Sequence, residues 1–198
     1  MKLIPLVFGI VTVLTVMAQQ TRPTCDHCLA TYVPAAELNA YFDRAPARAV
    51  ATGVADQQVR ALDVGKSHVD VGVVYRGKLT DPAKSPVAEH DLVSEVYHVI
   101  DGEATLVTGP DIEGLVRRPA ANNNVRNLNG PGSNGTSIRN GAAYHLKAGD
   151  VVVIPAGVGH WFTEIEDHIR YLMIRVDPDK VTPLKGEAES KADLAAGK

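Results

Sequence analysis

The sequence has little cysteine, no excess of one charge, and no repeat. Its 20 basic and 23 acidic residues give a formal net charge of −3, and both signs are interspersed along the chain. There is no basic run and no stripe of basic and aromatic residues, so the sequence offers no nucleic-acid surface and no patch for an anionic membrane. Without an internal repeat, a chain of 198 residues is expected to form one domain.

Residues 1–18 have the pattern of a secretory signal peptide. Lys2 precedes an apolar stretch, Leu3 to Val16, and the small-residue cleavage signal ends at Ala18. This predicts cleavage before Gln19 and a secreted or periplasmic protein. An uncleaved membrane anchor is the alternative, but the stretch is shorter than the roughly 20 residues that span a bilayer. No other segment is apolar enough to cross a membrane, so none is expected in contact with one after cleavage.

The only two cysteines lie together, in the stretch Cys25-Asp26-His27-Cys28. In an exported chain such a pair forms a small-loop disulfide, a redox dithiol or half of a metal site. It precedes any expected strand, unlike a thioredoxin-type pair. Leu29 stands where a haem-attachment motif needs histidine. A structural disulfide between Cys25 and Cys28 is the favoured prediction.

The most informative stretch runs from Gly149 to His160 and reads G-x5-P-x-G-x2-H. Its first two residues predict a tight turn, and the apolar run 151–154 is typical of a short buried strand. Pro155 stops ladder pairing, and the glycines that follow it permit a sharp bend. His160 is therefore expected at the start of the next strand.

A second motif lies upstream, between His90 and Gly102. Four residues separate His90 from Glu95, and six more separate Glu95 from Gly102. Asp101-Gly102 is also a two-residue hairpin signal. In residue type, spacing and order the two motifs resemble the signature motifs of the cupin superfamily, over roughly residues 65–178. The resemblance implies an all-β fold, a cupin-type antiparallel jelly-roll β-barrel, with a short N-terminal helix before it.

The resemblance also implies a metal site with one departure. Cupins that bind metal usually hold it with three histidines and one glutamate, but Ala88 stands where the first histidine would fall. The remaining positions are His90, Glu95 and His160. Two imidazoles and one carboxylate form a triad with open coordination positions, suited to a divalent ion such as Fe, Mn, Ni, Zn or Cu. The alternative is that these residues line a polar pocket that holds no metal.

Other candidates for the site follow from strand alternation. Glu164 replaces the final asparagine of the family's second motif and is a candidate general base. Tyr97 and Phe162 share the parity of Glu95 and His160, so they form either a wall of a substrate pocket or part of the core. Tyr171 and Arg175 share a strand face, and an inward Arg175 would bind a substrate carboxylate.

The sequence divides into an N-terminal segment, residues 19–58, a barrel over residues 59–180, and a flexible tail over residues 181–198. Within the first segment, residues 33–42 predict a short helix with Pro34 in its first turn. Residues 109–140 form a long loop rich in Asn, Gly and Pro, a kind of segment that often carries function or disorder.

Shorter elements are predicted inside these segments. In the long loop, residues 115–116 and 136–138 are candidates for a hairpin. Near the end of the barrel, residues 161–164 and 170–176 are expected as separate strands with a turn at Glu166-Asp167.

The resemblance implies an exported, divalent-metal-dependent enzyme of oxygenase, isomerase or lyase type that acts on a small organic molecule. Fold alone does not choose among these chemistries. A non-catalytic, metal-free cupin that binds or senses a small ligand is the alternative. A homodimer is expected from the family.

Overall fold

The computed structural model describes Thr24 and residues 28–197. The signal segment 1–18 and Cys25 lie outside the described residues, so the predictions of export and of a Cys25–Cys28 disulfide stay predictions. Among the described residues, no helix combines the length and the apolar character needed to cross a membrane.

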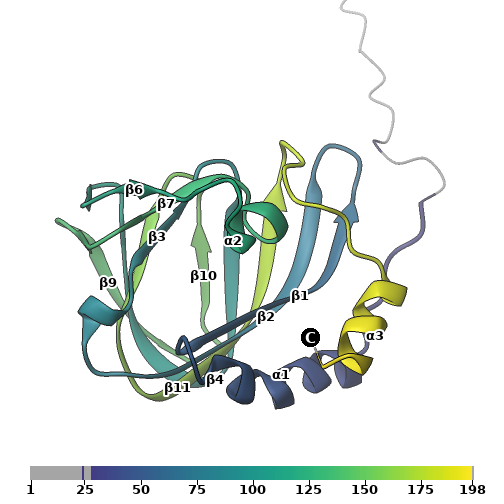
Figure 1. The fold of residues 1–198 in the computed structure, drawn as a ribbon, viewed down its shortest axis with the longest axis horizontal. Helices are drawn as coiled ribbons and strands as arrows, with labels where there is room; N and C mark the ends of the chain where they lie inside the picture. Colours follow the sequence, from purple (N-terminus) through teal and green to yellow (C-terminus); the bar gives the residue numbers. More distant parts are fainter. Residues whose placement is uncertain (1–23, 25–27, 198) are drawn as a thin grey trace, which may run out of the picture.

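The fold is all-β with few helices, as predicted (Figure 1). In chain order the elements are α1 (Ala35–Ala49), β1 (Val54–Asp63), β2 (His68–Leu79), the 3-10 helix η1 (Pro82–Lys84), β3 (Val87–His90), β4 (Ser94–Gly109), β5 (Ile112–Glu113), β6 (Val116–Arg117), α2 (Asn123–Asn127), β7 (Gly132–Gly135), β8 (Ser137–Ile138), β9 (Ala142–Lys147), β10 (Val151–Ile154), β11 (Gly159–Asp177) and α3 (Glu187–Ala195). The predicted N-terminal helix is therefore confirmed as α1, and it extends beyond residue 42.

The main sheet is antiparallel and does not close into a barrel. Its path runs β1-β2-β11-β3-β7-β6, and β4 pairs with β11, β9 and β10. Among the described strands, β1, β6, β9 and β10 each have a single partner, so the ladder stays open. The prediction of a closed barrel is corrected to an open jelly-roll sheet. The long loop rich in Gly and Asn contributes only short strands, and such strands cannot carry the ladder around a full ring.

The core lies inside the curved sheet, between alternating side chains of β4 and β11. Tyr97, Leu106, Phe162 and Tyr171 belong to its largest buried cluster. On the outer side, α1 covers β1 and β2, where Tyr41 packs with buried valines of both strands (Figure 1). Both faces of this layer are therefore covered, and β2 has buried residues on each face, such as Val73 and Val74.

The predicted hairpin at Asp101-Gly102 is wrong. β4 runs through these residues without turning, and Gly102 has a φ of +76°. Opposite Gly102, the ladder with β11 skips several residues, and a Cβ at this position would meet the carbonyl oxygen of His168. The glycine thus allows a bulge with close backbone approach and does not form a turn. For the same reason β11 is one strand, with an irregular register at Glu166-Asp167 in place of the predicted turn.

The second motif folds as predicted at its turns but not in its burial. Gly149 has a φ of +93°, the strand β10 follows, and His160 stands near the start of β11. However, Val151 and Val153 are 60% and 66% exposed, and only Ile154 of this strand is buried. Among the described strands β10 pairs with β4 alone, and the side chains of Val151 and Val153 are exposed on one of its faces.

Most of the predicted flexible tail, residues 181–198, is ordered, because it contains the helix α3, Glu187–Ala195, which contacts β1. The backbone of Lys185 forms an isolated antiparallel β-bridge with Ala61, and α3 then lies beside α1 (Figure 1). Ser190 is fully buried, and its Oγ lies 2.9 Å from the hydroxyl of Tyr41. Contacts between residues so distant in the chain leave no local sequence pattern. The charged, alanine-rich composition of this segment therefore predicted a flexible tail.

The long loop is ordered into short elements. β6 pairs with β7, and β5 pairs with β8, so the candidate hairpin between residues 115–116 and 136–138 has different partners from those predicted. β7 in turn pairs with β3, which ends at His90. This pairing places the loop over the motif residues.

Candidate metal centre

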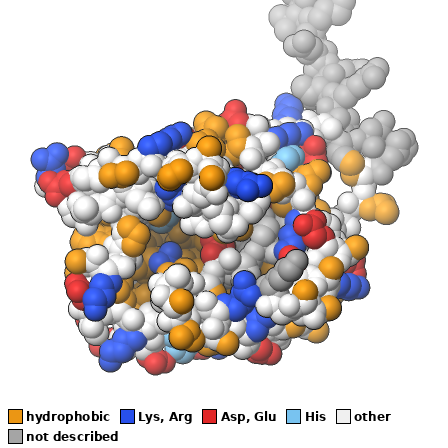
Figure 2. Space-filling model, viewed as in Figure 1, with side chains coloured by type: hydrophobic (Ala, Val, Ile, Leu, Met, Phe, Trp, Pro, Cys, Tyr) orange, Lys and Arg blue, Asp and Glu red, His pale blue; other side chains and the backbone are white. Residues whose placement is uncertain are grey.

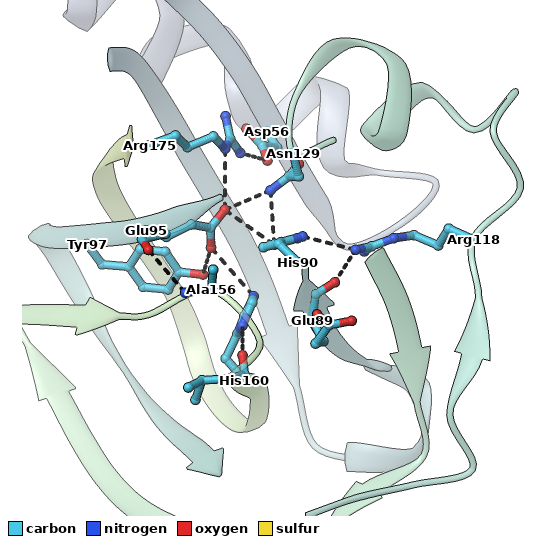
Figure 3. Close-up of polar contacts among 12 residues, drawn as sticks. Asp56, Glu89, His90, Glu95, Tyr97, Arg118, Asn129, Ala156, His160 and Arg175 are labelled. Atoms are coloured by element: carbon cyan, nitrogen blue, oxygen red, sulfur yellow. Dashed lines mark hydrogen bonds and ion pairs between the residues drawn. The ribbon is translucent and has the colours of Figure 1, made fainter. Parts of the chain in front are cut away.

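His90, Glu95 and His160 come together inside the sheet from three different strands (Figure 3). His90 ends β3, Glu95 follows the start of β4, and His160 follows the start of β11. Each is buried, and one possible ligand atom from each lies within 4.8 Å of the others. Glu95 is central, because its Oε1 lies 3.4 Å from His90 Nε2 and its Oε2 lies 3.5 Å from His160 Nε2.

Backbone contacts between the two motifs hold these side chains in place. The Gly157 amide donates to the His90 carbonyl over 2.8 Å, and the Ala156 amide donates to Ser94 Oγ over 3.1 Å. The β11–β3 ladder sets His160 opposite Ala88. The bend that Pro155 and the following glycines produce therefore docks directly on the first motif.

Three further side chains donate hydrogen bonds to Glu95. Tyr97 Oη donates to Oε2 over 2.7 Å, Asn129 Nδ2 donates to Oε1 over 2.7 Å, and Arg175 Nε donates to Oε1 over 3.3 Å. Burial alone would raise the pKa of Glu95, but the nearby histidines, Arg175 and the Tyr97 hydrogen bond outweigh it and lower the pKa. The carboxylate is therefore ionised at neutral pH, and its two oxygens are fixed in direction.

His160 is arranged to present an unprotonated nitrogen to Glu95. Its Nδ1 lies 3.2 Å from the Val158 carbonyl oxygen, which can only accept, so Nδ1 carries the proton. Burial lowers the pKa of His160, which keeps the imidazole neutral. The Nε2 lone pair then faces a carboxylate oxygen across 3.5 Å. Two acceptors held at this distance in a buried site form a place for a cation.

His90 has the opposite tautomer. Arg118 Nη2 lies 3.0 Å from its Nδ1, and a guanidinium can only donate, so Nδ1 accepts. Burial lowers the pKa of His90, so the neutral ring carries its single proton on Nε2, directed toward Glu95. Without a metal, the Nε2 proton of His90 therefore lies between His90 and Glu95.

Asn129 completes the ring of groups around Glu95. Its side-chain nitrogen lies 3.0 Å from His90 Nε2 as well as 2.7 Å from Glu95 Oε1. Nε2 of His90 carries a proton, so two donors meet at this contact. A turn of the amide through 180° would bring its oxygen to the same place, beside both candidate ligand atoms.

Arg175 does not present its charge to a ligand. It is fully buried, and it binds Asp56, Gln58 and Glu95 (Figure 3). Burial alone would lower the pKa of this guanidinium, but the Asp56 and Glu95 carboxylates outweigh it and raise the pKa. The prediction that Arg175 binds a substrate carboxylate is corrected, because the protein's own carboxylates occupy it.

The remaining predicted site residues do not line a pocket beside the triad. Tyr97, Phe162 and Tyr171 are packed in the core, with the Tyr97 and Tyr171 ring centroids 4.4 Å apart. The core interpretation therefore holds for them, and Tyr97 in addition orients Glu95. Glu164 is exposed and lines a small cleft with Glu103 and His145, so the structure does not place it with the triad.

Sequence reasoning missed Arg118, Asn129 and Asp56 as neighbours of the triad. The first two come from the long loop, whose length was the one signal that pointed toward function. No motif marks which of its residues turn inward. Asp56 belongs to β1 and reaches the site only through Arg175.

The donor set fits a divalent ion. Metal–ligand bonds of about 2.0–2.2 Å place the ligand atoms of one centre about 3.0–3.5 Å apart, and the two His–Glu distances fall in that range. Two imidazole nitrogens and a carboxylate are ligands shared by Fe, Mn, Ni, Zn and Cu sites.

The open jelly-roll sheet, with the two motifs meeting inside it, is a cupin-type fold, as the sequence motifs predict. A family model described as the AraC-like ligand binding domain matches residues 134–194. This match includes His160 and Arg175 but not His90 or Glu95. No curated protein matches the chain.

Several solved structures are similar to this chain at low identity. BH2720 from Bacillus halodurans is 15% identical, with a TM-score of 0.43, over 84% of this chain and 98% of that chain. The DMSP lyase DddQ from Ruegeria pomeroyi DSS-3 is 16% identical, with a TM-score of 0.40, over 68% of this chain and 51% of that chain. A recombinant oxalate oxidase in complex with glycolate is 16% identical, with a TM-score of 0.37, over 65% and 53%. The match thus spans about half of the lyase and oxidase chains.

Proposed function

We propose that this protein binds one divalent metal ion through His90, Glu95 and His160, and that it acts on a small organic molecule bound beside them. The observation that carries the proposal is the buried His160 ring, whose Nδ1 lies against the Val158 carbonyl oxygen and whose Nε2 lies 3.5 Å from Glu95 Oε2. A cation between these two acceptors removes their repulsion. Chemistry of oxygenase, isomerase or lyase type is compatible with such a centre.

A bound divalent ion would supply Lewis-acid or oxygen-activating chemistry at this site. The chain's own residues prepare the donors. Tyr97, Asn129 and Arg175 fix the direction of the Glu95 oxygens, and the Val158 carbonyl fixes the tautomer of His160. Burial of the triad excludes bulk water from the space between the donors.

A second candidate function is capture or sensing of a small ligand without catalysis. The match to an AraC-like ligand binding domain favours it, and so does Ala88, because a binder does not need the full cupin ligand set. In this reading the triad is a hydrogen-bonded polar cluster at the end of a ligand pocket.

Metal content separates the two functions. Elemental analysis of protein purified without a metal-binding tag is expected to find near-stoichiometric transition metal, and thermal denaturation after chelation is expected to show restabilisation by added divalent ions. A protein that contains no metal, takes up none and is stabilised only by organic ligands would contradict the metal proposal and support the second function.

Arg118 is expected to weaken metal binding by His90. A ligating histidine normally donates its second N–H to an acceptor, whereas Arg118 offers His90 Nδ1 another donor. In Arg118→Gln, the amide oxygen can accept from Nδ1–H, so we expect the affinity for divalent metal to rise about tenfold. Competition with a chromophoric chelator measures the change. Arg117→Gln is the matched control, since Arg117 is exposed and pairs with Asp91; weaker binding in Arg118→Gln than in this control would contradict the tautomer argument.

Three further parts of the proposal concern the whole protein. Cleavage of residues 1–18 and export are inferred from sequence alone, as are a Cys25–Cys28 disulfide and the division at residues 58 and 180. A homodimer is proposed from the cupin resemblance. The exposed Val151 and Val153 of the edge strand β10 support it, because unpaired apolar strand edges are otherwise an aggregation hazard.

A further inference from the structure

A cavity of about 370 Å³ opens beside the triad. Two of its lining residues connect it to the candidate metal centre: Ala88 faces His160 in the β11–β3 ladder, and Arg118 contacts His90. Figure 2 shows this face of the molecule hollowed, with hydrophobic and charged side chains in the depression. Cavities of this size hold small organic ligands. Because position 88 carries only a methyl group, the space that a histidine would fill there stays part of the cavity.

The charge of this cavity is of one sign. Arg76, Lys78, Lys84 and Arg118 line it, and none of the described residues in its lining is acidic. The rest of the lining includes apolar side chains, namely Leu79, Pro86 and Ile165. A pocket with several cations, no carboxylate and apolar walls is complementary to an organic anion with an apolar body.

Among the residues that the structure describes, none of the four cations in this pocket forms an ion pair with a carboxylate, and Arg76 is the one whose guanidinium is held by two side-chain contacts. Its Nε donates to the Tyr171 hydroxyl over 3.1 Å, and its guanidinium lies over the Phe162 ring, 4.4 Å from the centroid. Among the described residues, neither of its terminal nitrogens has a hydrogen-bond or ion-pair partner. The two contacts hold the guanidinium in one orientation, with the terminal donors left for a ligand. Such a preoriented fork suits a carboxylate, which it can bind through two parallel hydrogen bonds.

We infer that this cavity binds a small monocarboxylate, with its carboxylate on Arg76 and its apolar part against Leu79 and Ile165. The inference deepens the proposed small-molecule function and rests on it, but it does not require a metal. It reassigns the carboxylate-binding role from Arg175, whose partners are internal, to Arg76, one strand away. Tyr171 and Phe162 then act as positioning residues that hold the Arg76 guanidinium.

A larger cavity of about 490 Å³ does not compete for this role. It lies between α2, α3 and β1, and its lining mixes Arg48 and Lys185 with Glu189 and Asp193. Its mixed charges give no preference for an anion.

The test is calorimetric titration of chelator-treated protein and of metal-loaded protein with benzoate and hexanoate, and with benzamide and hexanamide as neutral matches. We expect both carboxylates to bind to the metal-free protein, and the amides to bind at least tenfold more weakly. Arg76→Gln should weaken carboxylate binding about 10- to 100-fold, since charge-assisted hydrogen bonds are lost. Arg76→Lys should recover only part of it, because the fork is lost while the charge remains. Arg139→Gln, at an exposed arginine outside the cavity, should leave binding unchanged.

Several results would overturn the inference. These are equal binding of amides and carboxylates, unchanged carboxylate binding in Arg76→Gln with circular dichroism like that of the parent, or no carboxylate binding up to about 10 mM. Failure of the metal proposal gives a different signature, since it removes metal uptake and leaves the Arg76-dependent titration of the metal-free protein intact. Loss of carboxylate binding with normal metal uptake would instead overturn the inference alone.

Discussion

Replacing His160 with alanine is expected to lower the affinity for divalent metal by about a thousandfold or more, because one of three protein ligands is removed. His160 is the ligand best prepared for metal, since its Nδ1 proton is held by the Val158 carbonyl and its Nε2 faces Glu95. The measurement is competition with a chromophoric chelator on tag-free protein, together with elemental analysis of the purified variant.

His98→Ala is the matched control for this variant. His98 lies on β4 only three residues from Glu95, but it is exposed and belongs to the opposite strand face. We expect its metal affinity to equal that of the parent protein. If the His160 variant also kept the parental affinity while folding normally, the bound metal would have to sit elsewhere, and the triad would be a polar cluster without a metal role.

Replacing Arg175 with methionine is expected to destabilise the protein by about 3–5 kcal/mol. Arg175 is fully buried between Asp56, Gln58 and Glu95, and its removal leaves the buried Glu95 and the partly buried Asp56 without their cation. Methionine keeps most of the side-chain length, so the cost is mainly electrostatic. Urea unfolding of chelator-treated protein at neutral pH gives the change in the free energy of unfolding.

The pH dependence of this loss has a definite sign. Burial already raises the pKa of Asp56, and without the Arg175 guanidinium, which lowers it, the pKa of Asp56 in the folded variant should rise further above that of the unfolded chain. The folded variant then binds more protons than the unfolded one, so stability is lost as pH rises through that window and is recovered in acid. If the loss in the free energy of unfolding were the same at about pH 4.5 and about pH 7, its cause would be lost packing and not charge.

The control for Arg175 lies on the same strand. Arg170 pairs with Asp101 and is only partly buried, so Arg170→Met is expected to cost about 1 kcal/mol or less. If the two variants lost equal stability, the interior ion pairs of Arg175 would not be the source of its effect.

The triad was predictable from sequence because its determinants are local. His90 and Glu95 are fixed relative to each other by a short connection between two strands, and His160 follows a turn whose glycine and proline residues dictate the bend. Strand alternation then directs these side chains inward. The helix α1 was predictable for the same kind of reason, since its start at Pro34 and its apolar positions are read within one or two turns.

Two other local patterns indicated the correct backbone or side-chain preference, but the structure predicted from each was wrong. Asp101-Gly102 needs a positive φ, which both a hairpin turn and a bulge in a continuous strand satisfy. The choice between them depends on whether β4 and β11 pair along their whole length. Likewise, the apolar residues of β10 predicted burial, but β10 pairs with β4 alone among the described strands, and Val151 and Val153 are exposed.

The sequence by itself determined the strand-rich cupin-type fold, the positions of three metal-ligand candidates, and the absence of a histidine at position 88. These depend on turn chemistry and on side-chain alternation, which act over a few residues. Only the tertiary structure decided which polar groups meet. It placed Arg118 and Asn129 from the long loop against His90 and neutralised Arg175 with Asp56. By contrast, the terminal nitrogens of Arg76 at the cavity have no hydrogen-bond or ion-pair partner within the described part of the chain. The partners are distant in the chain, 28 residues for Arg118 and His90, 39 for Asn129 and His90, and 119 for Arg175 and Asp56, and no local pattern encodes which polar groups will meet.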